Sequence, residues 1–312
     1  MKKIALLMML LAGGNCAAAH QKTPPPAQSP TTWQAVTLLD SQQRTLYSKF
    51  TNKNYLIQVT AVGSPPTDGY PVVYVLDGNV FFPTASTVAQ TLYGRPNQTT
   101  PKSMLIVGIG YADSKGFHVK ARAEDYTPPS ANYPTPQGEI QKFGGAEQFY
   151  QFIRQELQPM LYTHWAINPN QQSLFGHSFG GLFVLYTLFN HPQSFQNYLA
   201  ASPSLWWNQG RIADDLTKLD NTHHAIRRIL ITQGELENGR KKHQFIPENL
   251  PKSTPISDLN NQQLANYLQQ QLPHTKITHQ HNLGQNHGTN AYPSLAQALF
   301  LLYQDCVADS QC

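Results

Sequence analysis

The chain contains the stretch Ser173-Leu174-Phe175-Gly176-His177-Ser178-Phe179-Gly180-Gly181, in which a short strand pattern passes directly into a helix pattern. Its first three residues are typical of a buried strand, and the mainly apolar residues 180–190 are typical of a helix. The residues between them match G-x-S-x-G, where small residues let strand and helix approach closely and the serine hydroxyl stands exposed at the helix N-terminus. The helix dipole favours an incipient oxyanion there. We therefore predict that Ser178 is a nucleophile and not an incidental serine in a glycine-rich turn.

Strand and helix patterns alternate on both sides of this stretch. Residues 72–76 and 104–109 are continuous apolar runs, which are typical of strands buried on both faces of a parallel sheet. The alternation predicts an α/β fold with a mostly parallel central sheet and helices on both faces. The other predicted strands are 45–50, 55–62, 198–201, 228–232 and 276–281, and the predicted helices are 146–164, 258–271 and 292–304.

The composition is that of a globular protein. Of the 312 residues, 40% are hydrophobic and 13% are charged, which excludes a collagen, a coiled coil and a wholly disordered chain. The formal net charge of +4 does not indicate a nucleic-acid partner. We expect a single folded domain over residues 33–312. Two long polar connections, residues 111–143 and 238–254, are candidate lid or substrate loops.

The N-terminal residues predict export to the periplasm or the outside. Met1-Lys2-Lys3, the apolar run 4–12 and the small residues up to Ala19 are the three parts of a signal peptide, residues 1–19. Residues 20–32 are rich in Gln, Thr, Ser and Pro and are expected to form a flexible linker. No apolar stretch is long enough for an integral membrane segment. Lipidation of Cys16 is the less favoured alternative, because Asn15 stands where a small residue is expected.

Two cysteines remain if Cys16 is removed with the leader, namely Cys306 and Cys312. An oxidising compartment would allow a local disulfide between them. The loop that such a bond closes is small, so the bond would stabilise the fold little. The sequence does not indicate an oligomeric state.

The partners of a nucleophilic serine are found in the expected chain order. The hydroxyl needs a histidine base and an acid that orients it, and on this kind of fold the order is serine, acid, histidine. His287, in Asn286-His287-Gly288, lies between the last predicted strand and the last helix, where the base must be. Glu235 and Glu237 both follow the strand 228–232. We prefer Glu237 as the acid, and Glu235 stays open as the alternative.

Two main-chain amides are expected to stabilise the oxyanion of the transition state. One belongs to the residue after the nucleophile, Phe179, and the other to a loop after an earlier strand. Asp77-Gly78-Asn79 follows the strand 72–76, so the amide of Asn79 is the candidate. Without the serine, acid and histidine, Asp-Gly-Asn would be interpreted as an ordinary turn.

Basic residues in the two long connections offer a cationic rim for an anionic substrate. They are Lys120, Arg122, Arg240, Lys241 and Lys242. The alternative is that they are solvated loop positions. The serine mechanism implies no metal and no organic cofactor.

At these residues the chain resembles the putative-esterase branch of the α/β-hydrolase superfamily. That branch includes siderophore esterases of the enterobactin and bacillibactin types, with esterase D and the mycolyltransferases as more distant relatives. The resemblance extends over most of the chain that follows the leader. Besides the serine motif it is carried by residues 69–79, by Arg122 with Asp125-Tyr126-Thr127-Pro128, by Ala201-Ser202-Pro203-Ser204-Leu205-Trp206-Trp207, by residues 234–237 and by Asn286-His287-Gly288.

The resemblance implies an α/β-hydrolase fold and ester hydrolysis at Ser178 with His287 as the base. It also implies an oxyanion hole from Asn79 and Phe179, and it suggests that Trp206 and Trp207 bind the substrate as walls of the acyl site. Some siderophore esterases of the branch resemble Ser–His dyads, so a dyad without an acid also stays open. Arg122, one of the basic residues of the long connections, is expected to bind the substrate through its charge. We expect an exported serine esterase that acts on a small-molecule ester, with the trilactone of a catecholate siderophore, apo or ferric, as the leading substrate. The alternatives are a general short-chain esterase or acyltransferase, and a non-catalytic binding protein on a hydrolase scaffold.

Overall fold

The structure is a computed structural model, and part of the chain is described in it. The chain divides into two units, residues 1–36 and 37–312, and the second holds every described helix and strand. The predicted leader 1–19 and linker 20–32, the basic residues Arg240, Lys241 and Lys242, and Cys312 lie outside the described residues. Among the described helices, none is long and apolar enough to cross a membrane. The described residues are 33, 35–94, 102–140, 142–219, 225–239 and 260–309.

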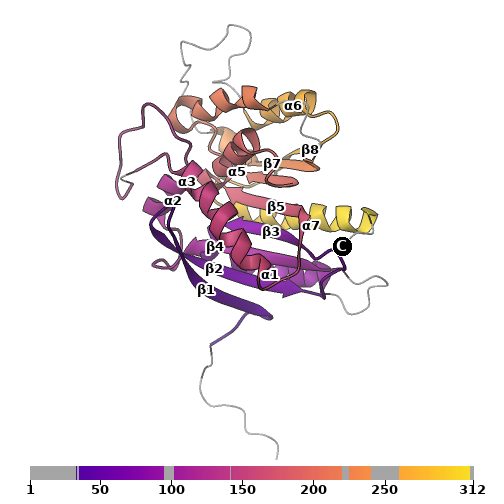
Figure 1. Cartoon of the computed structure of the whole chain (residues 1–312). Helices are drawn as coiled ribbons and strands as arrows, with labels where there is room; N and C mark the ends of the chain where they lie inside the picture. Colours follow the sequence, from indigo (N-terminus) through magenta and orange to yellow (C-terminus); the bar gives the residue numbers. More distant parts are fainter. Residues whose placement is uncertain are drawn as a thin grey trace, which may run out of the picture. The chain divides into compact units, whose positions relative to one another are not determined.

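Eight strands form a single sheet in the order β1-β2-β4-β3-β5-β6-β7-β8 (Figure 1). β1 and β2 run antiparallel to each other, and β2 runs antiparallel to β4, while all other neighbours are parallel. The predicted mostly parallel sheet is therefore confirmed. The strands are β1 (Ser41–Ser48), β2 (Lys53–Val62), β3 (Tyr70–Leu76), β4 (Met104–Tyr111), β5 (Ile167–His177), β6 (Asn197–Ala201), β7 (Arg228–Gly234) and β8 (Lys276–Asn282).

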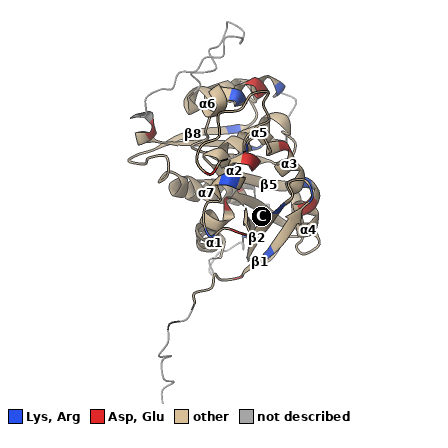
Figure 2. Cartoon of the chain, turned by 90° about the vertical axis from the view of Figure 1, so that its left-hand side faces the viewer, with Lys and Arg blue, Asp and Glu red and all other residues tan. Residues whose placement is uncertain are grey.

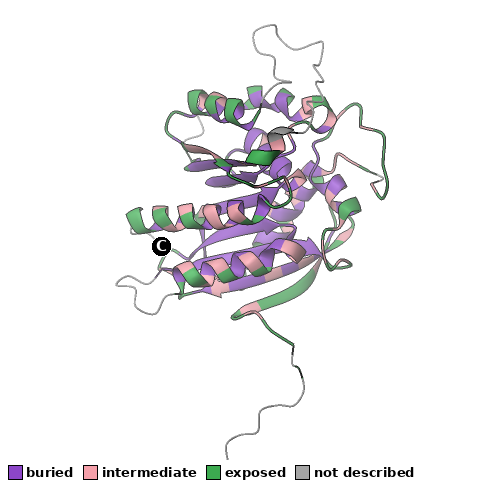
Figure 3. Cartoon of the chain, turned by 180° about the vertical axis from the view of Figure 1, so that it is seen from behind, coloured by how far each residue is buried: buried purple, intermediate pink, exposed green. Residues whose placement is uncertain are grey.

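Helices cover both faces of the sheet, because the strands are apolar on both sides. In β3, Val72 and Tyr74 pack into a core shared with α3, α5 and α6, while Val73 and Val75 pack on the opposite face with α1 and α7. Figure 3 shows the buried strands between the helices and the exposed outer surfaces of α6 and α7. The helical segments are α1 (Gly78–Tyr93), α2 (Val119–Asp125), α3 (Ala146–Phe152), η1 (Ile153–Leu157), α4 (Gln158–Tyr162), α5 (Phe179–Asn190), η2 (Trp207–Lys218), η3 (Glu235–Gly239), α6 (Asn261–Gln271) and α7 (Ala291–Asp309).

Three features differ from the sequence-based expectation. The 16-residue helix α1 was not expected after β3. The helix expected over 146–164 consists of α3, a turn of π-helix and α4. The long connection 111–143 contains a short helix, α2.

Cys306 is disulfide-bonded. Its predicted pairing with Cys312 stays a prediction, because Cys312 lies outside the described residues.

Charged residues are sparse, and both signs are interspersed along the described ribbon (Figure 2). Of the basic residues considered for a cationic rim, Lys120 is exposed and Arg122 is half-buried. In that view neither sign gathers over one part of the described ribbon.

Candidate active site

The serine motif forms a sharp turn between β5 and α5. Ser178 has φ 61° and ψ −116°, a backbone conformation that a residue with a side chain rarely adopts. A Cβ at position 176 would overlap the main-chain carbonyl of Gly180, so only glycine allows strand and helix to approach this closely. The Ser178 amide donates to the carbonyl of Ala201 at 3.0 Å, which ties the turn to β6. The strained conformation holds the hydroxyl above the carboxyl edge of the sheet.

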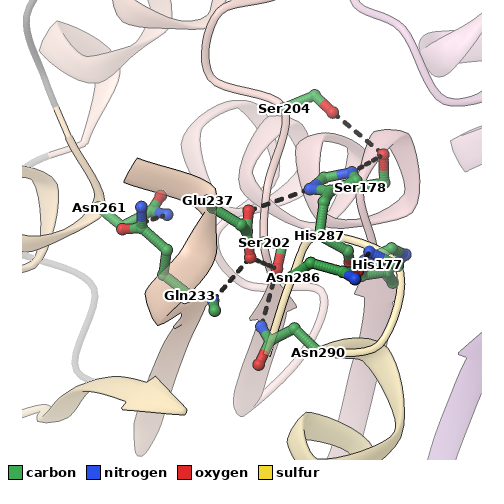
Figure 4. Close-up of polar contacts among 12 residues, drawn as sticks. His177, Ser178, Ser202, Ser204, Gln233, Glu237, Asn261, Asn286, His287 and Asn290 are labelled. Atoms are coloured by element: carbon green, nitrogen blue, oxygen red, sulfur yellow. Dashed lines mark hydrogen bonds and ion pairs between the residues drawn. The ribbon is translucent and has the colours of Figure 1, made fainter. Parts of the chain in front are cut away.

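Ser178, His287 and Glu237 are joined by hydrogen bonds (Figure 4). The Nε2 atom of His287 lies 2.9 Å from Ser178 Oγ, and its Nδ1 atom lies 3.0 Å from Glu237 Oε2. Since a carboxylate only accepts, Nδ1 donates to Glu237, and the lone pair of Nε2 faces the serine hydroxyl. The arrangement allows the imidazole to take the hydroxyl proton. The three residues come from the turns after β5, β8 and β7.

The environment of Glu237 keeps its carboxyl group ionised. Its Oε1 atom accepts from the Gly234 amide at 2.6 Å and from the Ser202 hydroxyl at 2.7 Å. Burial alone would raise the pKa of Glu237, but the hydrogen bonds from His287, Ser202 and Gly234 outweigh it and lower the pKa. A carboxylate held by three donors can orient the imidazole and stabilise its protonated form.

Glu235, the other candidate acid, is placed differently. It is exposed, and its Oε2 atom accepts from the main-chain amide of Gly284 at 2.8 Å. This bond helps to hold the loop between β8 and α7. Of the two glutamates, only Glu237 contacts the imidazole of His287.

A buried polar network that the sequence did not suggest lies behind the acid. The Ser202 hydroxyl, which donates to Glu237, accepts from Asn290 Nδ2 at 2.8 Å. Asn290 Oδ1 in turn accepts from Asn282 Nδ2 at 2.6 Å. Because each buried polar group has its partner, the network fixes the orientation of the Glu237 carboxylate.

A second serine contacts the nucleophile. Ser204 is fully buried, and its Oγ atom lies 3.2 Å from Ser178 Oγ. Its main-chain amide also donates to the Ser178 carbonyl at 3.2 Å. Ser204 thus holds the nucleophile from the side of the loop after β6. Ser204 belongs to the stretch Ala201–Trp207 that carries the family resemblance, but the sequence did not indicate a role for its hydroxyl.

The turns that carry the two expected oxyanion donors lie next to each other. Asn79 is in the first turn of α1 and Phe179 in the first turn of α5, where amides lack acceptors within their helix. The two helices follow the neighbouring strands β3 and β5, and the Cβ position of Gly180 is 3.6 Å from Asp77 Oδ2. The Asn79 side chain is engaged with the Tyr111 main chain, through Oδ1 at 2.7 Å and Nδ2 at 3.0 Å. Its main-chain amide is thereby held in place.

Arg122 does not offer a free charge to a substrate. Its guanidinium binds Asp77 with two hydrogen bonds, of 2.9 and 3.0 Å, and donates a third to the His177 carbonyl at 3.3 Å. Burial would lower the pKa of Arg122, but the Asp77 carboxylate outweighs it and raises the pKa. The substrate-binding role expected from the position of Arg122 in a long polar connection is therefore not supported by its contacts. The structure makes Arg122 an anchor of the turn after β3.

The two tryptophans expected to wall the acyl site are placed differently from each other. Trp206 is 66% exposed, and its ring centroid lies 6.2 Å from that of Phe179, next to the nucleophile. Trp207 is only 2% exposed and packs against Tyr133 and Phe143 of the long connection. Trp206 can therefore line a substrate site, whereas Trp207 fixes the connection and presents almost no surface to a ligand.

The described residues contain no group of three or more His, Cys, Asp or Glu side chains that could hold a metal ion.

Comparisons with known proteins show the family to which the chain belongs. Residues 48–290 match the family described as "Putative esterase". The ferri-bacillibactin esterase BesA of Bacillus subtilis is 37% identical over 218 residues, which are 67% of this chain and 75% of that protein. A siderophore enterobactin esterase of Emericella nidulans is 35% identical over 171 residues, 50% of this chain and 55% of that protein.

The fold recurs in a crystal structure of the BES protein from Bacillus cereus. It superimposes with a TM-score of 0.72 at 30% identity and covers 87% of this chain and 98% of the other. The match to an esterase family favours an enzyme over a non-catalytic binding protein. The chain belongs to the "Putative esterase" family, has the α/β-hydrolase fold and is a carboxylic ester hydrolase.

Proposed function

We propose that the protein is an exported serine esterase that hydrolyses the ester bonds of a catecholate-siderophore trilactone. The observation that carries the serine mechanism is the hydrogen-bonded series from Glu237 through His287 to Ser178, with distances of 3.0 and 2.9 Å. The substrate class is supported by the relatives named above as ferri-bacillibactin and enterobactin esterases.

The first chemical step forms the bond between Ser178 Oγ and the ester carbonyl carbon. As it forms, the hydroxyl proton passes to His287 Nε2, and the carbonyl double bond becomes a single bond to an oxyanion. Glu237 stabilises the resulting imidazolium through Nδ1–H. The amides of Asn79 and Phe179 donate to the oxyanion, where preorganised donors contribute most because they need no reorganisation.

The second half of the reaction regenerates the serine. The bond to the alcohol oxygen breaks, and that oxygen takes the proton from His287 Nε2, which leaves an acyl-enzyme. Water then attacks the acyl carbon and gives its proton to His287, and the collapse of the second tetrahedral intermediate returns the proton to Ser178 Oγ. In a cyclic trilactone the acid and the alcohol belong to one molecule, so the first turnover opens the ring without releasing a fragment.

Ser178→Ala tests the mechanism. We expect turnover to fall by at least about a thousandfold, because the covalent step is lost while the oxyanion donors remain. An unchanged circular dichroism spectrum and melting temperature would show that the fold is intact. Retained activity above about a thousandth of the wild-type rate would refute the serine mechanism.

The substrate class is tested by comparing a catecholate trilactone, apo and ferric, with a p-nitrophenyl short-chain ester. A kcat/KM at least about tenfold higher for the trilactone, roughly 1.4 kcal/mol in transition-state binding, supports the siderophore assignment. Equal or faster turnover of the simple ester would indicate a general esterase instead. Added alcohol acceptors would reveal acyl transfer by its ester products.

Export is supported by the sequence of residues 1–19 and is tested by the intact mass of the protein from the periplasm or medium. A chain that begins at His20 indicates ordinary cleavage, and a lipidated Cys16 at the N-terminus indicates anchoring. A full-length chain in the cytoplasm would contradict export. The same spectrum, with and without reductant, reports whether Cys306 and Cys312 are joined.

A further inference from the structure

A buried histidine stands directly before the nucleophile, and the proposed mechanism does not use it. His177 is the last residue of β5 and is 5% exposed. Its Nε2 atom lies 2.7 Å from the main-chain carbonyl oxygen of His287 (Figure 4). A carbonyl can only accept, so Nε2 carries the hydrogen and donates it to the base's own backbone.

His177 is uncharged at neutral pH. Burial is the main reason that its pKa is lowered from 6.5 to about 4, and the nearby imidazole of His287 and the guanidinium of Arg122 lower it further. The carboxylate of Asp77 and the hydrogen bond to the His287 carbonyl act in the opposite direction. The centroids of the two imidazole rings are 4.9 Å apart. A neutral His177 therefore lies beside the base while the base gains and loses its proton.

The loop that carries His287 is mostly exposed, and it is attached to the turn after β7 by the bonds from the Gly284 amide to Glu235 and from the Leu236 amide to the Gln285 carbonyl. Residues 283, 284, 286, 288 and 289 are all exposed. The side chain of His287 is held by Glu237 and Ser178, both of which take part in the proposed reaction, while its main chain is held by His177. The hydrogen bond from His177 is thus a main-chain attachment of the base that takes no part in the proton transfer.

His177 is also attached to the turn after β3. Its carbonyl accepts from Arg122, and Arg122 binds the Asp77 carboxylate with two hydrogen bonds. The amide of Asp77 donates to the Tyr126 hydroxyl at 3.2 Å. One residue therefore connects the loop of the base, the nucleophile turn and the turn of the Asn79 amide.

We infer that His177 is a positioning residue, which sets the place of His287 through the bond from its Nε2–H to the His287 carbonyl. The inference rests on the proposed roles of Ser178 and His287. Displacements of about 1 Å in a catalytic group can cost about a hundredfold in rate, far more than one hydrogen bond contributes to folding. Loss of the donor is therefore expected to lower kcat strongly while it changes the free energy of unfolding little.

The test compares His177→Leu with His177→Gln on a p-nitrophenyl ester. Leucine has no donor, whereas the Nε2 atom of glutamine can reach the place of the histidine Nε2. We expect His177→Leu to lower kcat by about tenfold to a hundredfold with KM changed less than about threefold. His177→Gln should recover most of the loss. Equal activity of His177→Leu and wild type, or equal losses in both variants at unchanged melting temperature, would refute the inference.

A double-mutant comparison separates positioning of the base from a general structural role. In a His287→Ala background, His177→Leu should cost less than about twofold, because the group that it positions is gone. The same tenfold or larger cost in both backgrounds would overturn the inference. If Ser178→Ala stays active, the proposed function fails; if Ser178→Ala is inactive and His177→Leu is not impaired, only the role of His177 fails.

A spectroscopic measurement remains decisive even if a variant does not fold. The nitrogen-15 NMR shifts of the histidine rings at pH 7 should show His177 neutral, with its hydrogen on Nε2. A neutral His177 ring that carries its hydrogen on Nδ1 would refute the inference, because Nε2 would then have no hydrogen to donate to the His287 carbonyl.

Discussion

Replacing Glu237 by glutamine should change the Nδ1 atom of His287 from a hydrogen-bond donor to an acceptor. The Oε1 atom of Glu237 accepts from two donors, the Gly234 amide and the Ser202 hydroxyl. In Glu237→Gln the amide oxygen must stay at this position, so the NH2 group turns to His287 Nδ1. That nitrogen then becomes an acceptor, and the ring hydrogen moves to Nε2, which faces Ser178 Oγ at 2.9 Å. In this tautomer Nε2 cannot take the serine proton.

The size of the effect follows from the loss of general-base catalysis with the geometry retained. The same change of tautomer in a serine-protease triad lowers kcat by about 10⁴. We expect a loss of about 10³ to 10⁴ in kcat here, equivalent to about 4 to 5.5 kcal/mol in activation free energy. KM should change little, because the Glu237 side chain lies behind the imidazole.

Glu235→Gln is the matched control, since it makes the same chemical change two residues away. The single described bond of this exposed carboxylate, from the Gly284 amide, can be accepted by an amide oxygen as well. Steady-state hydrolysis of a p-nitrophenyl ester should therefore stay within about threefold of wild type. Retention of more than a tenth of kcat by Glu237→Gln would refute a triad and favour a Ser–His dyad. An equal loss in Glu235→Gln would refute the assignment of the acid.

Three further changes test other parts of the site. Arg122→Met should lower the free energy of unfolding by about 3–5 kcal/mol in chemical denaturation, because the buried Asp77 carboxylate loses its cation, and adding Asp77→Asn should recover most of it; stability unchanged by Arg122→Met would contradict this. The free energy of unfolding should fall by up to about 3 kcal/mol as the pH falls from 6.5 to about 4, because the histidine is protonated in the unfolded chain over this range but stays neutral when buried. If the pH dependence of the free energy of unfolding is unchanged in His177→Gln, it does not originate at His177. Trp206→Ala should raise KM for aryl esters by about twofold to tenfold with an unchanged melting temperature, and an unchanged KM would place the acyl site elsewhere.

Most of the sheet could be predicted because its strands are apolar on both faces. The runs in β3 and β4 carry the pattern of a buried parallel sheet in their own residues. Helix α1 was not predicted, because Asp77-Gly78-Asn79 is typical of a turn and Pro83 is typical of the end of a helix. The helix forms nonetheless because it buries Phe81, Phe82, Ala85 and Ala89 on the sheet. Tertiary burial outweighs the local preference.

The triad candidates could be predicted because the fold fixes their chain order. The roles of Arg122 and His177 could not be predicted, since they depend on partners that are 45 and 110 residues away in sequence. An arginine in a polar connection is normally solvated, and nothing local shows that Asp77 neutralises it. The same holds for Ser202, whose acceptor Glu237 is 35 residues later. Contacts of this range are set by the packing of the strands and not by the spacing of residues.

Three residues with strained backbone lie where the site is assembled. Asp77, Ser178 and Ser202 are the first residues after β3, β5 and β6, which are neighbours in the sheet, and their φ angles are 53°, 61° and 43°. Each such conformation costs about 1–3 kcal/mol and persists only where the surroundings hold it. Here the Ser178 amide donates to the β6 end, the Ser202 amide donates to Thr232 at 2.9 Å, and Asp77 is held by its ion pair with an arginine. Each strained turn is bonded to a different neighbouring element. A substitution that loosens the turn at Ser178, Ser202 or Asp77 should therefore displace mainly the nucleophile, the acid or the oxyanion donor, respectively. Steady-state kinetics of such variants can distinguish the three effects.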